Sequence, residues 1–229
     1  MITATAITTM MITAMTENSS LLTMLQWLSP AFPIGAFAYS HGLEWAIEAG
    51  HVKDALSLQL WFEDLITLGS GRSDAILVAL AYQAEDRAAL KNLNDLALAL
   101  SPSAERRSET VLQGDAFGQT VKDVWNLDAQ GLSYPVAVGY SARCEGLQRK
   151  EITAAYLQAF VANLISAAVR LVPLGQTQGQ RVLHVLMPDI QKVALEALSA
   201  TEDDLTSAAF LSDIASMCHE TLKTRIFKT

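Results

Sequence analysis

The most continuous apolar pattern in the chain lies between residues 154 and 171. Apolar or small residues fill nearly every position there, and only Gln158, Asn163 and Arg170 interrupt them. A helix without a polar face is typical of the interior of a helical protein. Asn163 and Arg170 are seven residues apart and therefore share one face of that helix. Because an unpaired buried charge is very costly, we expect the charge of Arg170 to be paired at a contact between helices or subunits.

The same region is the best candidate for a membrane span. Residues 152–169 carry no charge, and their number, 18, is near the minimum for crossing a bilayer. Polar residues are spread through the stretch, and Arg170 follows it directly. We therefore favour a buried core helix and expect no membrane partner.

Helical spacing of apolar residues recurs along most of the remaining chain, and no segment alternates apolar and polar residues as a strand would. Asp54 is expected to cap one helix, and Gly69 to Gly71 is expected to form a turn. The predicted helices cover residues 21–28, 40–50, 54–69, 74–84, 86–100, 106–125, 135–147 and 154–172, then a segment that ends before Pro188, and a last helix at 201–223. We predict an all-α fold, a single compact bundle of about ten helices formed by residues 19–229.

Composition narrows the classes of partner. The chain is 51% hydrophobic and only 17% charged, which suggests either that much of its surface is buried against partners or that the chain is membrane-bound. The net charge of -8 disfavours nucleic acid as a partner. Cys144 and Cys218 show no metal or redox spacing and are compatible with a reducing cytosol. Residues 1–18 are low in complexity, and we interpret them as a disordered extension or as a misassigned start, with Met15 as an alternative.

Catalytic and metal-binding patterns are not evident in the sequence. His41, His51, His184 and His219 are scattered, and Cys218 lies next to His219 at a helical spacing that turns the two apart. Tight binding of a transition metal calls for clustered His, Cys or carboxylate ligands. We therefore predict no metal ligands, no cofactor and no catalytic residues. The segment 106–109, Arg-Arg-Ser-Glu, is interpreted as a solvated helix face.

The connection after Pro173 is uncharged and rich in amide and hydroxyl groups. It contains Gly175, Gln176, Gln178 and Gly179. The simplest interpretation is a corner between two helices that hydrogen-bonds its own ends, and the alternative is a contact platform for a partner. The segment lacks the Lys-Ser/Thr ending of a phosphate-binding loop, which excludes nucleotide binding here.

Three stretches resemble signatures of the UreF family of urease accessory proteins. They are NLISAAVRLVPLGQTQGQRVL at 163–183, SPAFPIGAFAYSHGLE at 29–44, and the C-terminal run from 213 to 229. Ala36 and Ala38 stand where the family usually has glycine and serine, and Lys223 stands where it usually has tyrosine. The resemblance marks a structural motif and possible interface, which comprises Gly35, Ser40, Gly42, Glu44, Arg170, Gly175, Gln176, Gln178 and Gly179.

The C-terminal run has a chemistry of its own. Lys223, Arg225 and Lys228 make a basic end on an acidic protein, and Ile226 and Phe227 lie where a core is hard to reach. A frayed, solvated end is one interpretation. We favour a tail, from about residue 219, that becomes ordered against a partner protein. The predicted partner-binding residues are His219, Glu220, Thr224, Arg225, Ile226 and Phe227.

The resemblance covers about residues 21–229 and implies a non-enzymatic, cytoplasmic scaffold. Such a protein would dimerise, bind the accessory protein UreD (UreH in some organisms) and recruit the GTPase UreG. It would regulate GTP-dependent delivery of nickel to apo-urease. The alternative that the residues leave open is a helical enzyme or ligand-binding protein with an apolar pocket lined by Asn163 and Arg170.

Overall fold

The computed structural model describes residues 19–229, and this part of the chain contains helices, turns and no strand. The prediction of an all-α fold is confirmed. The predicted N-terminal extension, residues 1–18, lies outside the described residues. A helix at residues 19–27 comes first. The elements that follow are η1 (Ala36–Ala38), α2 (Leu43–Glu48), α3 (Ala55–Thr67), α4 (Ser70–Gln83), α5 (Arg87–Ala99), α6 (Ala104–Trp125), α7 (Tyr134–Cys144), α8 (Arg149–Leu171), α9 (Gln176–Ala197), η2 (Glu202–Asp204) and α10 (Phe210–His219).

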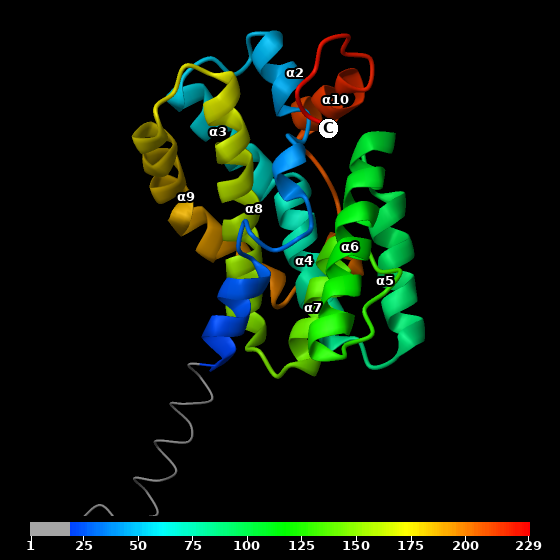
Figure 1. The fold of residues 1–229 in the computed structure, drawn as a ribbon. Coiled ribbons are helices and arrows are strands. Elements are labelled where there is room, and N and C mark those ends of the chain that lie inside the picture. Colours follow the sequence, from blue (N-terminus) through cyan, green and yellow to red (C-terminus); the bar gives the residue numbers. More distant parts are fainter. Residues whose placement is uncertain (1–18) are drawn as a thin grey trace, which may run out of the picture.

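The helix α8 is the central element of the bundle. It packs against α4, α7 and α9, and Figure 1 shows α9 on one side of it and α5 and α6 on the other. Its fully buried residues include Ile152, Leu157 and Val161. By length and composition α8 is the one described helix that could cross a membrane, but half of its apolar stretch is buried inside the protein. That burial agrees with the expected core helix.

Local capping explains where several helices begin. The side chain of Asp54 accepts a hydrogen bond from the backbone N–H of Ser57, and the Ser57 hydroxyl accepts from the backbone N–H of Asp54 in return. This reciprocal arrangement satisfies N–H groups that the first turn of a helix leaves free. Asp86 caps α5 and Ser103 caps α6 in one direction only, since each side chain accepts one backbone N–H, that of Ala89 and that of Arg106. The predicted cap at Asp54 is therefore confirmed.

Three predicted boundaries are wrong: the helix end before Pro188, the turn at residues 69–71 and, as the next paragraph describes, the last helix. The helix α9 continues through Pro188, since Ile190, Val193 and Ala197 beyond it remain buried and outweigh the strain of the proline ring. The expected turn at residues 69–71 is instead the start of α4.

The expected last helix at 201–223 is broken. A short turn, η2, ends at Asp204, and α10 begins only at Phe210. The backbone between them bonds to other elements: Arg72 donates to the carbonyl of Asp204, and the N–H of Ala208 donates to the carbonyl of Leu68. These bonds satisfy backbone groups that a continuous helix would have paired internally.

Candidate functional site

The second motif, residues 29–44, forms a tight corner before α2. His41 and Gly42 both adopt left-handed backbone conformations, with φ of 55° and 74°. A Cβ atom on Gly42 would lie 2.5 Å from the backbone nitrogen of Ser216 in α10. Only glycine fits such a close approach at a positive φ. The Ser-His-Gly sequence therefore lets α10 pack directly on the corner.

The tail, residues 220–229, returns to the same corner. The N–H of Lys228 donates to the carbonyl of Ala38 at 2.8 Å, and the N–H of Ser40 donates to the carbonyl of Thr229 at 2.9 Å. The Phe227 side chain is 3% exposed, whereas that of Ile226 is 71% exposed. The expectation that this apolar pair cannot reach a core is therefore wrong for Phe227. In Figure 1 the tail and α10 lie together at one end of the bundle, beside α2.

Glu44, from the family motif, fastens the tail to α2. Its carboxylate accepts the backbone N–H groups of Ile226 and Phe227 at 2.7 and 2.9 Å. The Nε2 atom of His219 lies 3.2 Å from the same carboxylate. Glu44 is thus a structural clamp that joins the corner, α10 and the tail.

The other nitrogen of His219 leads to the start of α6. Its Nδ1 atom lies 2.7 Å from Glu105, and Arg225 forms an ion pair with the same carboxylate. Glu220 accepts the backbone N–H of Ala104 at 2.7 Å, at the N-terminus of α6, where a negative charge is favourable. The predicted partner-binding residues His219, Glu220 and Arg225 therefore hold the chain's own α6. Thr224 is exposed and takes no part in these bonds.

Beneath this clamp lies a buried polar cluster, formed by His41, Arg106, Glu109, Gln113 and Thr229. Glu109 lies 2.6 Å from Nε2 of His41, 2.5 Å from Nη1 of Arg106 and 3.1 Å from Nε2 of Gln113. The hydroxyl of Thr229 donates to it at 2.8 Å. The cluster ties the tail to α6 and to the corner.

Burial and charge set the protonation of this cluster. Burial works to raise the pKa of Glu109, but the charges and hydrogen bonds of Arg106 and His41 outweigh it and bring that pKa to about 2. Burial and the nearby guanidinium lower the pKa of His41, which favours the neutral imidazole. The cluster is therefore an Arg–Glu ion pair with a neutral histidine and is internally balanced in charge.

The interpretation of residues 106–109 as a solvated face is wrong for half of the segment. Arg106 and Glu109 are 7% and 2% exposed, while Arg107 and Ser108 are on the solvent side. A signal was available in the sequence, because Arg106, Glu109 and Gln113 continue the helical row of the apolar Phe117 and Val121. A polar row that extends an apolar one indicates buried polar groups that must pair.

Asn163 and Arg170 share a face of α8, as predicted, and both hold the corner. Asn163 donates to the carbonyl of Ala36 at 2.8 Å, and Arg170 donates to the carbonyl of Phe37 at 3.0 Å. The Arg170 guanidinium also lies over the ring of Phe227, 4.6 Å from its centre. The expected charge pair is not found among the described residues. Arg170 is exposed, so water and the aromatic ring solvate its charge instead.

The connection 173–175 behaves as a helix corner that bonds its own ends. The Gln178 side chain accepts the backbone N–H of Gly175 at 3.1 Å. A Cβ on Gly179 would lie 2.9 Å from Val169 and 3.0 Å from Ile165, so this glycine allows α9 to approach α8 closely. Gln176 lies on the rim of a groove described next. A role of this segment as a contact platform stays a prediction.

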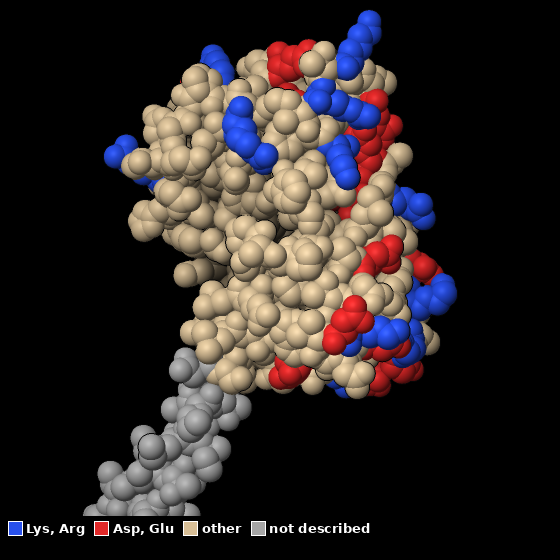
Figure 2. Space-filling model, viewed as in Figure 1, with Lys and Arg blue, Asp and Glu red and all other residues tan. Residues whose placement is uncertain are grey.

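A groove of about 470 Å³ opens between the corner, α6, α8 and the start of α9. Its rim carries amide and aromatic side chains, including Asn163 and Phe160, and its charged residues, Arg106 and Glu109 among them, belong to the buried floor. Figure 2 shows that the surface next to the hollow is almost free of Lys, Arg, Asp and Glu; the acidic residues gather mainly toward the right edge of the view, and basic residues are spread over the upper part and the right edge. Of the two residues predicted to line such a pocket, Asn163 does so and Arg170 does not.

Within residues 19–229, no three His, Cys, Asp or Glu side chains group as a metal site would require. The polar groups that the motifs bring together bond to one another and to the chain's own tail. The fold and site thus define a helical protein that uses its most unusual residues to hold α10 and the tail in place.

Comparison with known proteins defines the family. The UreF family model matches residues 52–187. The urease accessory protein UreF of Ruegeria pomeroyi is 51% identical over 212 residues, which cover 93% of this chain and 98% of that protein. The UreF protein of Cereibacter sphaeroides (strain KD131) is 52% identical, over 93% of this chain and 100% of its own length. The UreF protein of Xanthobacter autotrophicus is 49% identical, over 92% of this chain and 91% of its own length. The chain belongs to the UreF family of urease accessory proteins.

Proposed function

We propose that this protein is a non-enzymatic scaffold of the cytoplasm that promotes the insertion of nickel, as cargo, into apo-urease. It would act as a homodimer, bind a UreD/UreH-like accessory protein and recruit a UreG-like GTPase, whose GTP-dependent delivery of nickel it would regulate. The family assignment and the three motifs support this proposal. The structure adds a specific candidate for the surface that binds the accessory protein.

The observation that carries the proposal is the outer face of α10. Phe210, Ile214 and Met217 are 70%, 49% and 51% exposed, and their spacing places them on one side of the helix. An exposed row of large apolar side chains indicates a protein contact. The inner face of the same helix carries the buried Ala215, Ser216 and His219, which meet the corner and α6.

The tail completes this surface in the proposal. Ile226 projects into solvent, whereas Phe227 is buried against Arg170. His219, Glu220 and Arg225 would then contribute to partner binding indirectly, because they fix α10 on the body of the protein. Ile226 and the α10 face would make the direct apolar contact.

The test is a pull-down of purified protein with its UreD/UreH-like partner. Burying one such side chain is worth about 1.5–3 kcal/mol, so the double change Phe210→Ser and Ile214→Ser should weaken the complex by at least about tenfold. The matched control is Leu56→Ser with Leu60→Ser, two exposed leucines on the outer side of α3. The control should bind as the unchanged protein does.

Two outcomes would contradict the docking role of α10. One is full retention of the partner by the α10 variant, and the other is an equal loss in the α3 control. A circular dichroism melt of each variant accompanies the pull-down, since all four positions are exposed and the fold should be unaffected.

A second candidate function rests on the groove. Its volume of about 470 Å³ is typical of small-molecule sites, and convergent polar groups lie at its floor. If the protein binds a ligand in this groove, the side chain of Asn163 should be accessible to that ligand. Soaking or titration with a metabolite library, read by the fluorescence of the protein, would favour this function if one compound saturates and Asn163→Leu abolishes its binding.

A further inference from the structure

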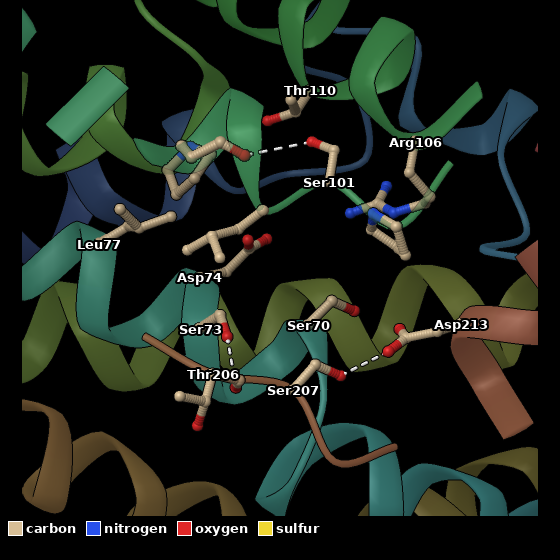
Figure 3. A pocket seen from close by; sticks show the side chains of 14 residues that line it. Ser70, Ser73, Asp74, Leu77, Ser101, Arg106, Thr110, Thr206, Ser207 and Asp213 are labelled. Carbon is tan, nitrogen blue, oxygen red and sulfur yellow. Dashed lines mark hydrogen bonds between the residues drawn. The ribbon is translucent and has the colours of Figure 1, made fainter. Parts of the chain in front are cut away.

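A second, smaller cavity shares Asp74, Arg106 and Thr110 with the groove and lies next to the segment that leads into α10. Its volume is about 90 Å³, and α4, α6, the α5–α6 connection and the segment before α10 surround it (Figure 3). At about 30 Å³ per water, it has room for roughly three waters or for one molecule of four or five heavy atoms.

The buried Arg106 and the half-buried Asp74 face each other across this cavity. Arg106 makes both of its hydrogen bonds, to His41 and Glu109, through Nη1, which leaves Nε and Nη2 as donors. Asp74 accepts from the Tyr156 hydroxyl at Oδ2, which leaves Oδ1 as an acceptor. Figure 3 shows the guanidinium and the carboxyl group pointing into the cavity from opposite sides. A ligand between them must accept on one side and donate on the other.

The remaining lining refines this requirement. The hydroxyl groups of Ser70 and Thr110 can donate or accept, and Leu77 supplies an apolar wall. Asp213 also lines the cavity, where it holds the hydroxyl of Ser207 at 2.7 Å. Ala97, Leu100, Pro102 and Pro135 add to the apolar wall, so the lining combines polar groups with an apolar surface of similar extent.

Charge and hydrogen-bonding capacity together exclude most classes of small ligand. A cation would carry no acceptor for the Nε and Nη2 donors of Arg106, which cannot lose its proton. An anion would meet Asp74 and Asp213, and the charge of Arg106 is already balanced by Glu109. An apolar molecule would leave the buried donors and acceptors without partners, which is costly. A neutral molecule with a carbonyl acceptor and an N–H donor remains.

We propose that this cavity binds a small, neutral, planar molecule of the primary amide class. Its carbonyl oxygen accepts from Nε or Nη2 of Arg106, and its amino group donates to Oδ1 of Asp74. Its apolar end lies against Leu77. The proposal concerns a site separate from the outer face of α10 and does not depend on the scaffold function.

The test uses a series of planar molecules of equal size in which only charge and hydrogen-bonding edges differ. Acetamide has the required donor and acceptor, acetate is an anion, acetamidinium is a cation, and acetone has no N–H. Each is titrated into the full-length protein and followed by NMR. Acetamide should saturate with a dissociation constant between tens of micromolar and millimolar, as expected for four heavy atoms. The other three should bind at least tenfold more weakly.

Location is checked by two further measurements. Magnetisation transfer from the methyl group of acetamide should reach the methyl groups of Leu77. Ser70→Val, which fills the cavity and removes a hydroxyl, should weaken binding at least tenfold, whereas Ser108→Val on the exposed side of α6 should not. Asp74→Leu provides a second cavity variant and removes the acceptor.

The outcomes that overturn the proposal are definite. If acetate or acetamidinium binds as well as acetamide, the charge argument is wrong. If acetamide does not saturate, or if its methyl group transfers magnetisation only to residues outside the cavity lining, acetamide does not bind in this cavity and the proposal is wrong.

Discussion

Glu109 offers the sharpest test of how the buried polar cluster stabilises the fold. The change Glu109→Gln keeps the shape of the side chain but leaves the guanidinium of Arg106 buried without its counter-charge. The pKa of Glu109 falls from 4.5 to about 2 in the folded protein, which corresponds to about 3 kcal/mol of preference for the charged form. Removing one partner of a buried ion pair costs about 3–5 kcal/mol. We expect a loss of this size at pH 7.

The pH dependence gives the sign of the effect. Because the pKa of Glu109 is lowered in the folded state, its contribution is complete above about 4.5 and is lost as the pH falls toward about 2. The difference in free energy of unfolding between the unchanged protein and Glu109→Gln should therefore shrink over that interval. Burial raises the pKa of Asp74 to about 6, and the charge of Glu109 adds to this rise, so the comparison is made below pH 4.5, where Asp74 is protonated in the folded state.

The measurement is urea unfolding at a series of pH values, followed by circular dichroism. Arg107→Gln, on the exposed side of the same helix, is the matched control and should change stability by less than about 0.5 kcal/mol. The double variant Arg106→Met with Glu109→Met should be less destabilised than Glu109→Gln alone, since no charge is left unpaired. A Glu109→Gln protein as stable as the control would refute the reasoning.

Four further predictions concern the corner and the chain ends. Arg170→Ala should cost about 1–2 kcal/mol in a thermal melt, because it removes one hydrogen bond and an exposed contact with the Phe227 ring; a loss of 4 kcal/mol would indicate a missed ion pair. Gly42→Ala should displace α10 and abolish partner pull-down, since its Cβ would overlap the backbone of that helix; normal binding would show that the corner can shift. A peptide fused after Thr229, which is 1% exposed, should release the tail and make it sensitive to trypsin, whereas an N-terminal fusion should not. A protein that starts at Met15 should fold and bind partners as the full chain does, and a lower melting temperature would contradict this.

The sequence was sufficient for the helical elements and insufficient for the cluster that joins them. Apolar periodicity identified α8 and its neighbours because burial repeats every three to four residues along a helix. The predicted helix end before Pro188 was wrong, because the burial of Ile190 and Val193 outweighs the local tendency of proline to break a helix. Glu109 and Thr229 are 120 residues apart, and no local pattern shows that one bonds to the other.

The family motifs could be identified in the sequence, but the structural roles of their residues could not. Gly42 and Glu44 belong to a family signature, but only the approach of α10 explains the glycine, and only the tail N–H groups explain the carboxylate. Phe227 best illustrates what the sequence alone could not show. Its apolar side chain suggested a contact, while the place where it is buried depends on Arg170 and on the corner.

The hydrogen bonds between the corner and the tail join residues that are far apart in the sequence, and this has a consequence for the order of folding. Ser40 and Thr229 bond across 189 residues, and Glu44 and Phe227 across 183. Contacts of such range form late, because the intervening chain must first be brought together at an entropic cost. During synthesis, Arg106 and Glu109 leave the ribosome long before the residues that cover them. The helical body can therefore assemble early, while α10 is locked in place only after residues 225–229 have been made, so that a chain interrupted before them would keep an open, hydrated charge pair.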